Sequence, residues 1–182
     1  MQFVRTEIPG VIIIEPRVFG DDRGYFMESF RQDLFCQHID DVRFVQDNES
    51  MSTRGVLRGL HYQLPPYAQS KLVRAVIGHV LDVALDIRKG STTYGRHVCV
   101  ELSDENKRQL FVPQGFAHGY VVLSEQSVVQ YKVDQCYAPD HERGIPFDDP
   151  DLSIDWRLPR GELVLSEKDR ANPLLRQADL FP

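Results

Sequence analysis

The sequence predicts an all-β sandwich or barrel, and the jelly roll is the form that suits its 182 residues. β-branched and aromatic residues recur in runs of about five to eight, bounded by Gly, Pro, Asp or Asn, as in short strands joined by turns. The hydrophobic fraction of 42% and the lack of repeats or low-complexity tracts are typical of an ordinary globular domain. This length suffices to bury a core, so we expect residues 1–182 to form a single domain.

Nine segments follow the strand pattern, and 80–87 shows it best. There, leucine, valine and isoleucine alternate with Asp82, Ala84 and Asp86, so one face packs and the other meets water or a polar cavity. The predicted strands are 11–14, 42–46, 56–62, 72–77, 80–87, 97–102, 109–112, 117–123 and 128–133. Short peripheral helices are predicted at 29–39, where Phe30, Leu34 and Phe35 share a face, and at 166–170.

Charge and cysteine content exclude several classes of protein. With 21 basic and 27 acidic residues the formal net charge is -6, which disfavours wholesale binding to nucleic acid but leaves room for a local phosphate pocket. Cys36, Cys99 and Cys136 are odd in number and widely spaced, unlike a disulfide framework or a cysteine-rich zinc site, so we expect buried or incidental thiols. No segment resembles a signal peptide or a membrane span, and we expect a cytoplasmic protein without membrane contact.

Two polar residues stand in the otherwise apolar strand LRGLHYQ, which is an unusual place for charge. A histidine such as His61 is more often a satisfied core residue than a catalyst. Arg58 shifts that balance, because a guanidinium seldom enters a barrel interior without an anionic partner. Gly59 between them would allow a bulge that redirects neighbouring side chains.

Other polar candidates are weaker when taken singly. Lys71, His118, Tyr131 and the Lys168–Asp169 pair could each be ordinary surface groups. Together they supply no metal site, because a cupin metal centre needs two histidines two residues apart, a carboxylate and a third histidine. Gln63 stands where the second histidine would be, so no metal is expected.

Motifs spread along the chain resemble one enzyme family. The stretches are FGDDRGYFMESF, FVQDNES, GVLRGLHYQ, SKLVRA, LDVALDIRKGS, ELSDENKRQLFVPQGFAHGY, YAPDHERG and LSEKD, and they are similar to the dTDP-4-dehydrorhamnose 3,5-epimerases nearly end to end. The resemblance implies a cupin-type jelly roll, a homodimer, and no metal or organic cofactor. It also implies inversion of C3 and C5 of a dTDP-4-keto-6-deoxyhexose, in dTDP-L-rhamnose synthesis.

The resemblance also implies a catalytic set. His61 resembles the general base, Asp169 its carboxylate partner, Tyr131 the opposing acid, and Lys71 a residue close to the keto oxygen. The chemistry independently requires such groups, because a carbon beside a ketone needs a base, a cation for the enolate oxygen and an acid on the other face. Histidine has a pKa of about 6.5 and tyrosine of about 10, which suits these two roles.

Substrate-binding positions are carried over in the same way. Tyr137 resembles the residue that stacks on the thymine ring, with Phe26 beside it, although an aromatic that merely caps the barrel is the alternative for Tyr137. Arg23, Arg58 and Lys168 resemble contacts to the diphosphate. The remaining binding positions are Glu28, Gln46, Asp47, Asn48, Lys71, His118 and Glu142.

Three alternatives stay open at this point. The sequence departs from the family pattern at Ser70, the loop LPPYAQS, the stretch SVVQYK and Pro146. Because related enzymes invert only one carbon or act on related dTDP-4-keto-deoxysugars, these departures leave a single-carbon epimerase open. A metal-dependent cupin enzyme would share the barrel, and an inactive sugar-nucleotide binding module would share the pocket.

We also expect the apolar run 11–14 to pair with the sheet of a second copy, because such a run seldom lies alone at an edge. Arg23 and Phe26 would then belong to a shared site.

Overall fold

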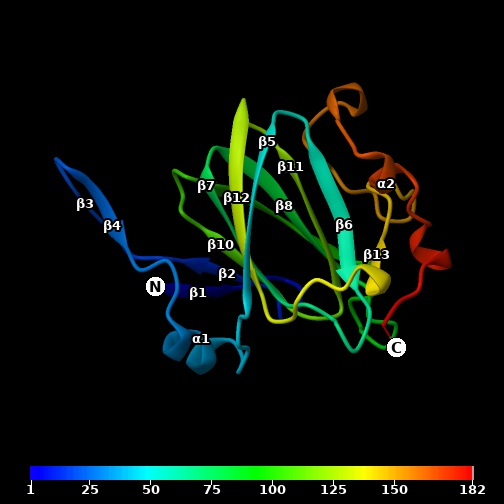
Figure 1. Ribbon diagram of the computed structural model, residues 1–182, viewed down its shortest axis with the longest axis horizontal. Helices are drawn as coiled ribbons and strands as arrows, with labels where there is room; N and C mark the ends of the chain where they lie inside the picture. The colour runs from blue at the N-terminus through cyan, green and yellow to red at the C-terminus, as the bar shows by residue number, and fades with distance from the viewer. Residues whose placement is uncertain (182) are drawn as a thin grey trace.

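A computed structural model describes residues 1–181, and it shows a cupin-like jelly roll of two facing β-sheets (Figure 1). The all-β prediction is confirmed. The first sheet contains, in spatial order, β1 (Gln2–Arg5), β2 (Ile12–Glu15), β10 (Gln109–Val112), β7 (Lys71–Ile77), β12 (Gln126–Val133) and β5 (Gln46–Thr53). The second contains β13 (Glu142–Gly144), β6 (Leu57–Gln63), β11 (Phe116–Val122), β8 (His79–Asp86) and β9 (His97–Ser103).

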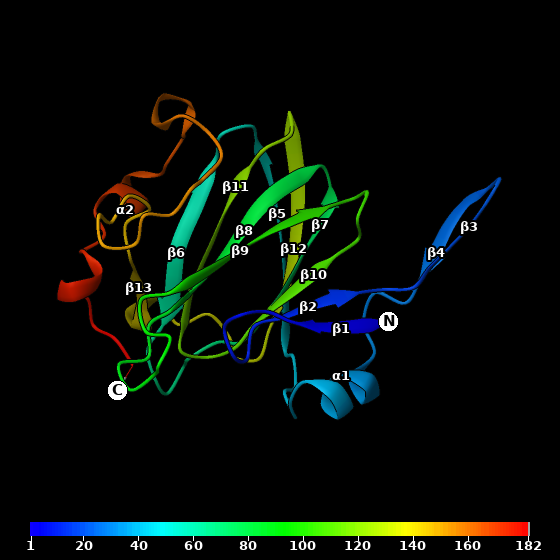
Figure 2. The same cartoon turned by 180° about the vertical axis from the view of Figure 1, so that it is seen from behind.

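The hydrophobic core lies between the two sheets. Val73 and Val129 of the first sheet pack in one cluster with Val80, Ala84 and Phe116 of the second. A second cluster covers the outer face of the second sheet, where the C-terminal segment packs against Leu81 and its neighbours (Figure 2). Strand β8 is therefore buried on both faces, as expected of a strand between two apolar layers.

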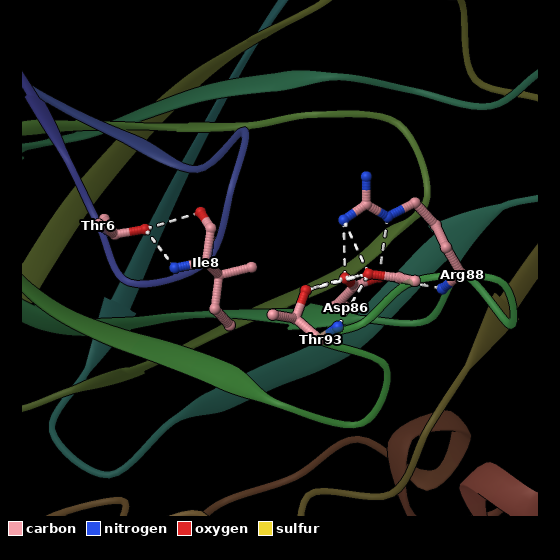
Figure 3. Close-up of polar contacts among 6 residues, drawn as sticks. Thr6, Ile8, Asp86, Arg88 and Thr93 are labelled. Atoms are coloured by element: carbon pink, nitrogen blue, oxygen red, sulfur yellow. Dashed lines mark hydrogen bonds and ion pairs between the residues drawn. The ribbon is translucent and has the colours of Figure 1, made fainter.

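The two aspartates of β8, Asp82 and Asp86, are fully buried and meet partners rather than bulk water. Asp86 accepts hydrogen bonds from Arg88 at 2.7 and 2.9 Å and from Ser91 and Thr93 at 2.6 Å each (Figure 3). Burial alone would raise the pKa of Asp86, but these donors outweigh it and lower the pKa to about 2. This network closes the turn between β8 and β9.

Two predicted helices are present in shorter form, α1 (Gln32–His38) and α2 (Glu167–Arg170), and single 3-10 turns occur at Pro139–His141, Arg160–Glu162 and Leu175–Gln177. Phe35 of α1 packs edge-on against Phe44 and Phe111, so α1 covers the outer face of the first sheet. No helix within residues 1–181 is long and apolar enough to cross a membrane.

Two expectations were wrong. The segment 42–46 is irregular and packs on α1, and the strand begins at Gln46. The run 11–14 is not at an edge, because β2 pairs with β1 on one side and β10 on the other. The thiols of Cys36, Cys99 and Cys136 are free and exposed, which fits the incidental alternative and not the buried one.

Sequence patterns also missed some elements, namely β1, β13 and the separate hairpin of β3 (Val18–Asp21) and β4 (Gly24–Met27). This hairpin projects away from the barrel in both views (Figures 1 and 2). The bulge at Gly59 is confirmed, since the pairing of β6 with β11 shifts register there. Gly59 has a φ of 130°, and a Cβ would lie 2.5 Å from Gly119 Cα, so only glycine fits.

Candidate active site

A cleft between the two sheets gathers most of the predicted site residues. It consists of two hollows, of about 550 and 210 Å³, which both include His61, Lys71 and Tyr131. The larger hollow is also lined by Ser50, Val56, Leu57, Arg58, His118, Tyr120, Val164, Leu165, Ser166, Lys168 and Asp169. The smaller is also lined by Gln46, Asn48, Tyr62, Gln63, Gln69, Tyr137 and Glu142. His61, Lys71 and Tyr131 therefore stand where the two hollows meet.

His61 and Asp169 form a hydrogen-bonded pair in the larger hollow. His61 Nε2 lies 2.5 Å from Asp169 Oδ1, although 108 residues separate them in sequence. Ser166 caps α2 by accepting from the Asp169 backbone N–H at 3.1 Å, and its hydroxyl donates to Asp169 Oδ2 at 2.8 Å. Burial raises the pKa of Asp169, but the hydrogen bonds from His61 and Ser166 outweigh that effect and leave the pKa below its usual value. The ionised carboxylate thus holds the ring by Nε2 and leaves Nδ1 as the nitrogen that can take up a proton.

Tyr131 faces His61 from the opposite sheet. It lies on β12 of the first sheet, whereas His61 lies on β6 of the second, and both line the same hollows. Burial and the neighbouring Tyr120 raise the pKa of Tyr131, and Arg58 opposes the shift only in part. The phenol therefore carries its proton at neutral pH and can act as an acid.

Lys71 supplies a buried cation to the same cleft. Its side chain is 9% exposed, and no salt bridge joins it to a carboxylate among residues 1–181. Burial lowers the pKa of Lys71 to about 8, while Asp82 and Glu142 partly counteract the shift. Such an ammonium group can stabilise a developing oxyanion more effectively than it would in water.

His118 is also held by a carboxylate. Its Nε2 lies 3.0 Å from both carboxylate oxygens of Asp82, and both residues are buried. Burial lowers the pKa of His118, although Asp82 opposes the shift. His118 lines the larger hollow, but its side chain is only 7% exposed, against 26% for His61. Burial disfavours the protonated form that a base must reach, so we do not assign His118 the role of base.

The smaller hollow ends in a polar and aromatic cluster. The Tyr137 hydroxyl donates to Glu142 Oε2, and the Lys168 ammonium pairs with the same oxygen. Burial raises the pKa of Glu142, but the bonds from Lys168 and Tyr137 outweigh it and lower the pKa. Arg58 lines the larger hollow, and its Nε donates to Ser52 Oγ at 3.1 Å.

The structure does not bring four predicted residues to the cleft of the same chain. Asp47 points to the opposite face of β5, where it pairs with Lys132 at 2.9 Å. Glu28 lies beyond β4 and pairs with Arg31 at 3.8 Å. Arg23 and Phe26 lie on the projecting hairpin, remote from the barrel (Figure 1).

Some site residues escaped the sequence analysis. Asp82 belongs to the polar face of 80–87, but its partner His118 comes from another strand and could not be anticipated. Ser166 could have been found, because a serine three residues before an aspartate is a helix-capping pattern. In the sequence, Gln63 stands out only because it occupies the position of the second histidine of a cupin metal centre. No cluster of three His, Cys, Asp or Glu side chains that could hold a metal occurs in the part of the chain that the structure describes.

Comparisons with known proteins agree on one family. The family described as dTDP-4-dehydrorhamnose 3,5-epimerase matches residues 5–177. A Pseudomonas aeruginosa protein of that name is 56% identical over 185 residues, covering 100% of each chain. A crystal structure of dTDP-6-deoxy-D-glucose-3,5-epimerase from Legionella pneumophila, in complex with dTDP-4-keto-L-rhamnose, is 48% identical with a TM-score of 0.94, covering 98% of this chain and 94% of that one. A 3'-monoepimerase from Streptomyces bikiniensis, in complex with dTDP-quinovose, is 34% identical with a TM-score of 0.89, covering 95% and 87%.

Proposed function

Because this chain belongs to the dTDP-4-dehydrorhamnose 3,5-epimerase family, we propose that it inverts C3 and C5 of dTDP-4-dehydro-6-deoxy-D-glucose to give dTDP-4-dehydro-L-rhamnose. This is a step of dTDP-L-rhamnose biosynthesis. The observation that carries the proposal for the site is the placement of His61 and Tyr131 on opposing sheets, with Lys71 at the same junction. An inversion requires a base and an acid on opposite faces of one carbon.

The reaction begins with proton removal by His61. Its ring takes the proton from a carbon beside the C4 ketone. The electron pair of the C–H bond then forms a C=C bond to C4, and the π pair of the C=O bond moves to the oxygen, which gives an enolate. Asp169 stabilises the imidazolium that forms, because its carboxylate is 2.5 Å from Nε2. Lys71 stabilises the enolate oxygen through its buried positive charge.

The second half of the reaction is proton delivery by Tyr131. The enolate collapses to the ketone as the carbon takes the phenolic proton on the face opposite to His61, which inverts the centre. Water then reprotonates Tyr131 and accepts the proton from His61, so the enzyme returns to its starting state. The same residues act on C3 and C5 in turn.

The nucleotide occupies the remainder of the cleft in this proposal. Arg58 and Lys168 contact the diphosphate, since guanidinium and ammonium groups suit phosphate oxygens. The Tyr137 ring stacks on thymine at the smaller hollow, with Gln46, Asn48 and Glu142 around it. These roles rest on the family resemblance together with the positions of the side chains in the cleft.

We also propose a homodimer in which the hairpin of β3 and β4 reaches the cleft of a second copy. Phe26 is 66% exposed on this hairpin, and Arg23 pairs with Asp21 of the same hairpin, so neither lines the cleft of its own chain. Light scattering at micromolar concentration tests the assembly. A monomer that retains full activity would contradict both the dimer and the shared roles of Arg23 and Phe26.

The decisive experiment for the function is turnover in heavy water. Incubating the protein with dTDP-4-keto-6-deoxyglucose should place deuterium at both C3 and C5 and yield the doubly inverted sugar, as followed by NMR and mass spectrometry. The competing proposal is a single-carbon epimerase, which the similarity to the Streptomyces bikiniensis 3'-monoepimerase favours. Deuterium at one carbon only would support that alternative, and no exchange would contradict both.

A further inference from the structure

Gln63 is a buried amide on the strand that carries the proposed base. It follows His61 by two residues on β6, lines the smaller hollow and is 3% exposed. Its Nε2 donates to the backbone carbonyls of Tyr67 at 2.6 Å and Cys136 at 3.3 Å, and its Oε1 accepts from the Ala138 N–H at 2.8 Å. Both ends of the amide are therefore engaged with main chain from two other segments.

Two of these bonds flank Tyr137. Cys136 and Ala138 are its immediate neighbours, and the segment 134–138 contains no strand or helix to hold it. The Tyr137 ring is 54% exposed, so packing alone does not fix it. Its own bonds run from the backbone N–H to Gln46 Oε1 at 3.3 Å and from the hydroxyl to Glu142. Within residues 1–181, Gln63 is thus the one side chain that hydrogen-bonds to the backbone on both sides of Tyr137.

We propose that Gln63 is a positioning residue for nucleotide binding: it holds the segment 136–138 so that Tyr137 forms a platform for the base before the substrate arrives. This inference rests on the proposed function. A platform that is already ordered costs less conformational entropy when the ligand binds, and the benefit appears as affinity. Gln63 itself bonds to Tyr67, Cys136 and Ala138 and to no proposed catalytic group, so proton transfer is unaffected.

The chemistry of the site requires an amide in this place. Glutamine supplies N–H donors for two carbonyls and an oxygen acceptor for an N–H, whereas glutamate supplies only acceptors and leucine supplies neither. Gln63→Glu keeps the shape and the bond to Ala138 but loses the bonds to the two carbonyls. Gln63→Leu loses all three bonds.

The experiment measures the dissociation constant of dTDP by calorimetry, alongside KM and kcat. Both variants should weaken dTDP binding by about threefold to tenfold and raise KM by the same factor. This is the effect expected when one or two groups that are ordered in the free wild-type protein must instead become ordered on binding. The value of kcat should stay within about twofold, and its pH profile should not move. In a Tyr137→Ala background, Gln63→Leu should cause no further loss, because both changes remove the same platform.

The matched control is Gln130→Leu. Gln130 accepts from Arg74 and donates to Glu49 on the other face of the first sheet, so deleting its amide should leave dTDP binding and turnover unchanged. A thermal melt of each variant checks folding, and Gln63→Glu serves if Gln63→Leu does not fold.

Three results would overturn the inference: unchanged dTDP affinity in both Gln63 variants, a fall in kcat at constant affinity, or additive losses in the Tyr137→Ala background. A wild-type protein that neither binds dTDP nor epimerises the sugar would instead overturn the proposed function, and this inference with it. Wild-type turnover with unchanged affinity in the Gln63 variants would overturn the positioning role alone.

Discussion

Replacing Lys71 with methionine is expected to raise the free energy of unfolding while removing activity. Burial lowers the pKa of Lys71 from 10.5 to about 8, even with Asp82 and Glu142 nearby. Each pKa unit corresponds to about 1.4 kcal/mol, so keeping this ammonium charged at neutral pH costs the folded state about 3 kcal/mol. Methionine has a similar unbranched shape and no charge, so Lys71→Met should recover up to that amount.

The pH dependence gives the sharper test. The folded protein loses the Lys71 proton near pH 8, whereas the unfolded chain keeps it until about pH 10.5. In that window the unfolded state binds more protons, so wild-type stability rises with pH relative to the variant. The stability advantage of Lys71→Met should therefore be complete below pH 8 and vanish by about pH 10.5.

Urea unfolding at several pH values measures this difference, and an epimerisation assay measures the activity. Loss of a charge that stabilises an oxyanion typically reduces turnover by about a hundredfold or more. The control is Lys132→Met, a partly exposed lysine paired with Asp47, whose removal should change stability by less than about 1 kcal/mol at any pH. If Lys71→Met were less stable than wild type at pH 7, or if the difference did not depend on pH, the energetic reasoning would be wrong.

Other predictions test the base and the acid, the stabilising role of Asp86, and the independence from metal. In His61→Ala, the rates of solvent exchange and of inversion should both fall by about a hundredfold to ten-thousandfold. In Tyr131→Phe, exchange should outlast inversion, because His61 can return deuterium to the same face. Normal inversion by Tyr131→Phe would point to water as the acid. Asp86 has a pKa lowered to about 2, so its stabilising effect is present above about pH 4 and is lost as the pH falls through about 2. The stability advantage of wild type over Asp86→Asn, about 2 kcal/mol by the same conversion, should shrink across that range in acid titrations. Activity should survive exhaustive chelation, and recovery only on adding one metal would show that a metal takes part.

The strands could be predicted wherever one face of the strand is apolar. They could not be predicted where the strand lines the cleft with polar residues. β5 has the sequence QDNESMST, and its partly buried positions, among them Gln46, Asn48 and Ser50, are polar because they line the two hollows. A strand with polar residues on both faces shows no hydrophobic alternation, so periodicity placed a strand in the apolar segment before it instead. That apolar segment packs on α1 through Val42 and Phe44, which satisfies the burial of those side chains without sheet pairing.

The same contrast applies to the two aspartates of β8. Both are fully buried, four residues apart on one face of the strand, and the sequence pattern does not distinguish them. The partners of Asp86, namely Arg88, Ser91 and Thr93, follow within seven residues, so a short turn is enough to assemble the network. Asp82 bonds His118, 36 residues away, and His61 bonds Asp169 across 108 residues, which requires strand pairing and chain return that no local pattern encodes. Local partners stabilise the turn at one end of the barrel, whereas distant partners build the cleft. This is why the residues of the site came from a whole-chain family resemblance, while their geometry came only from the folded structure.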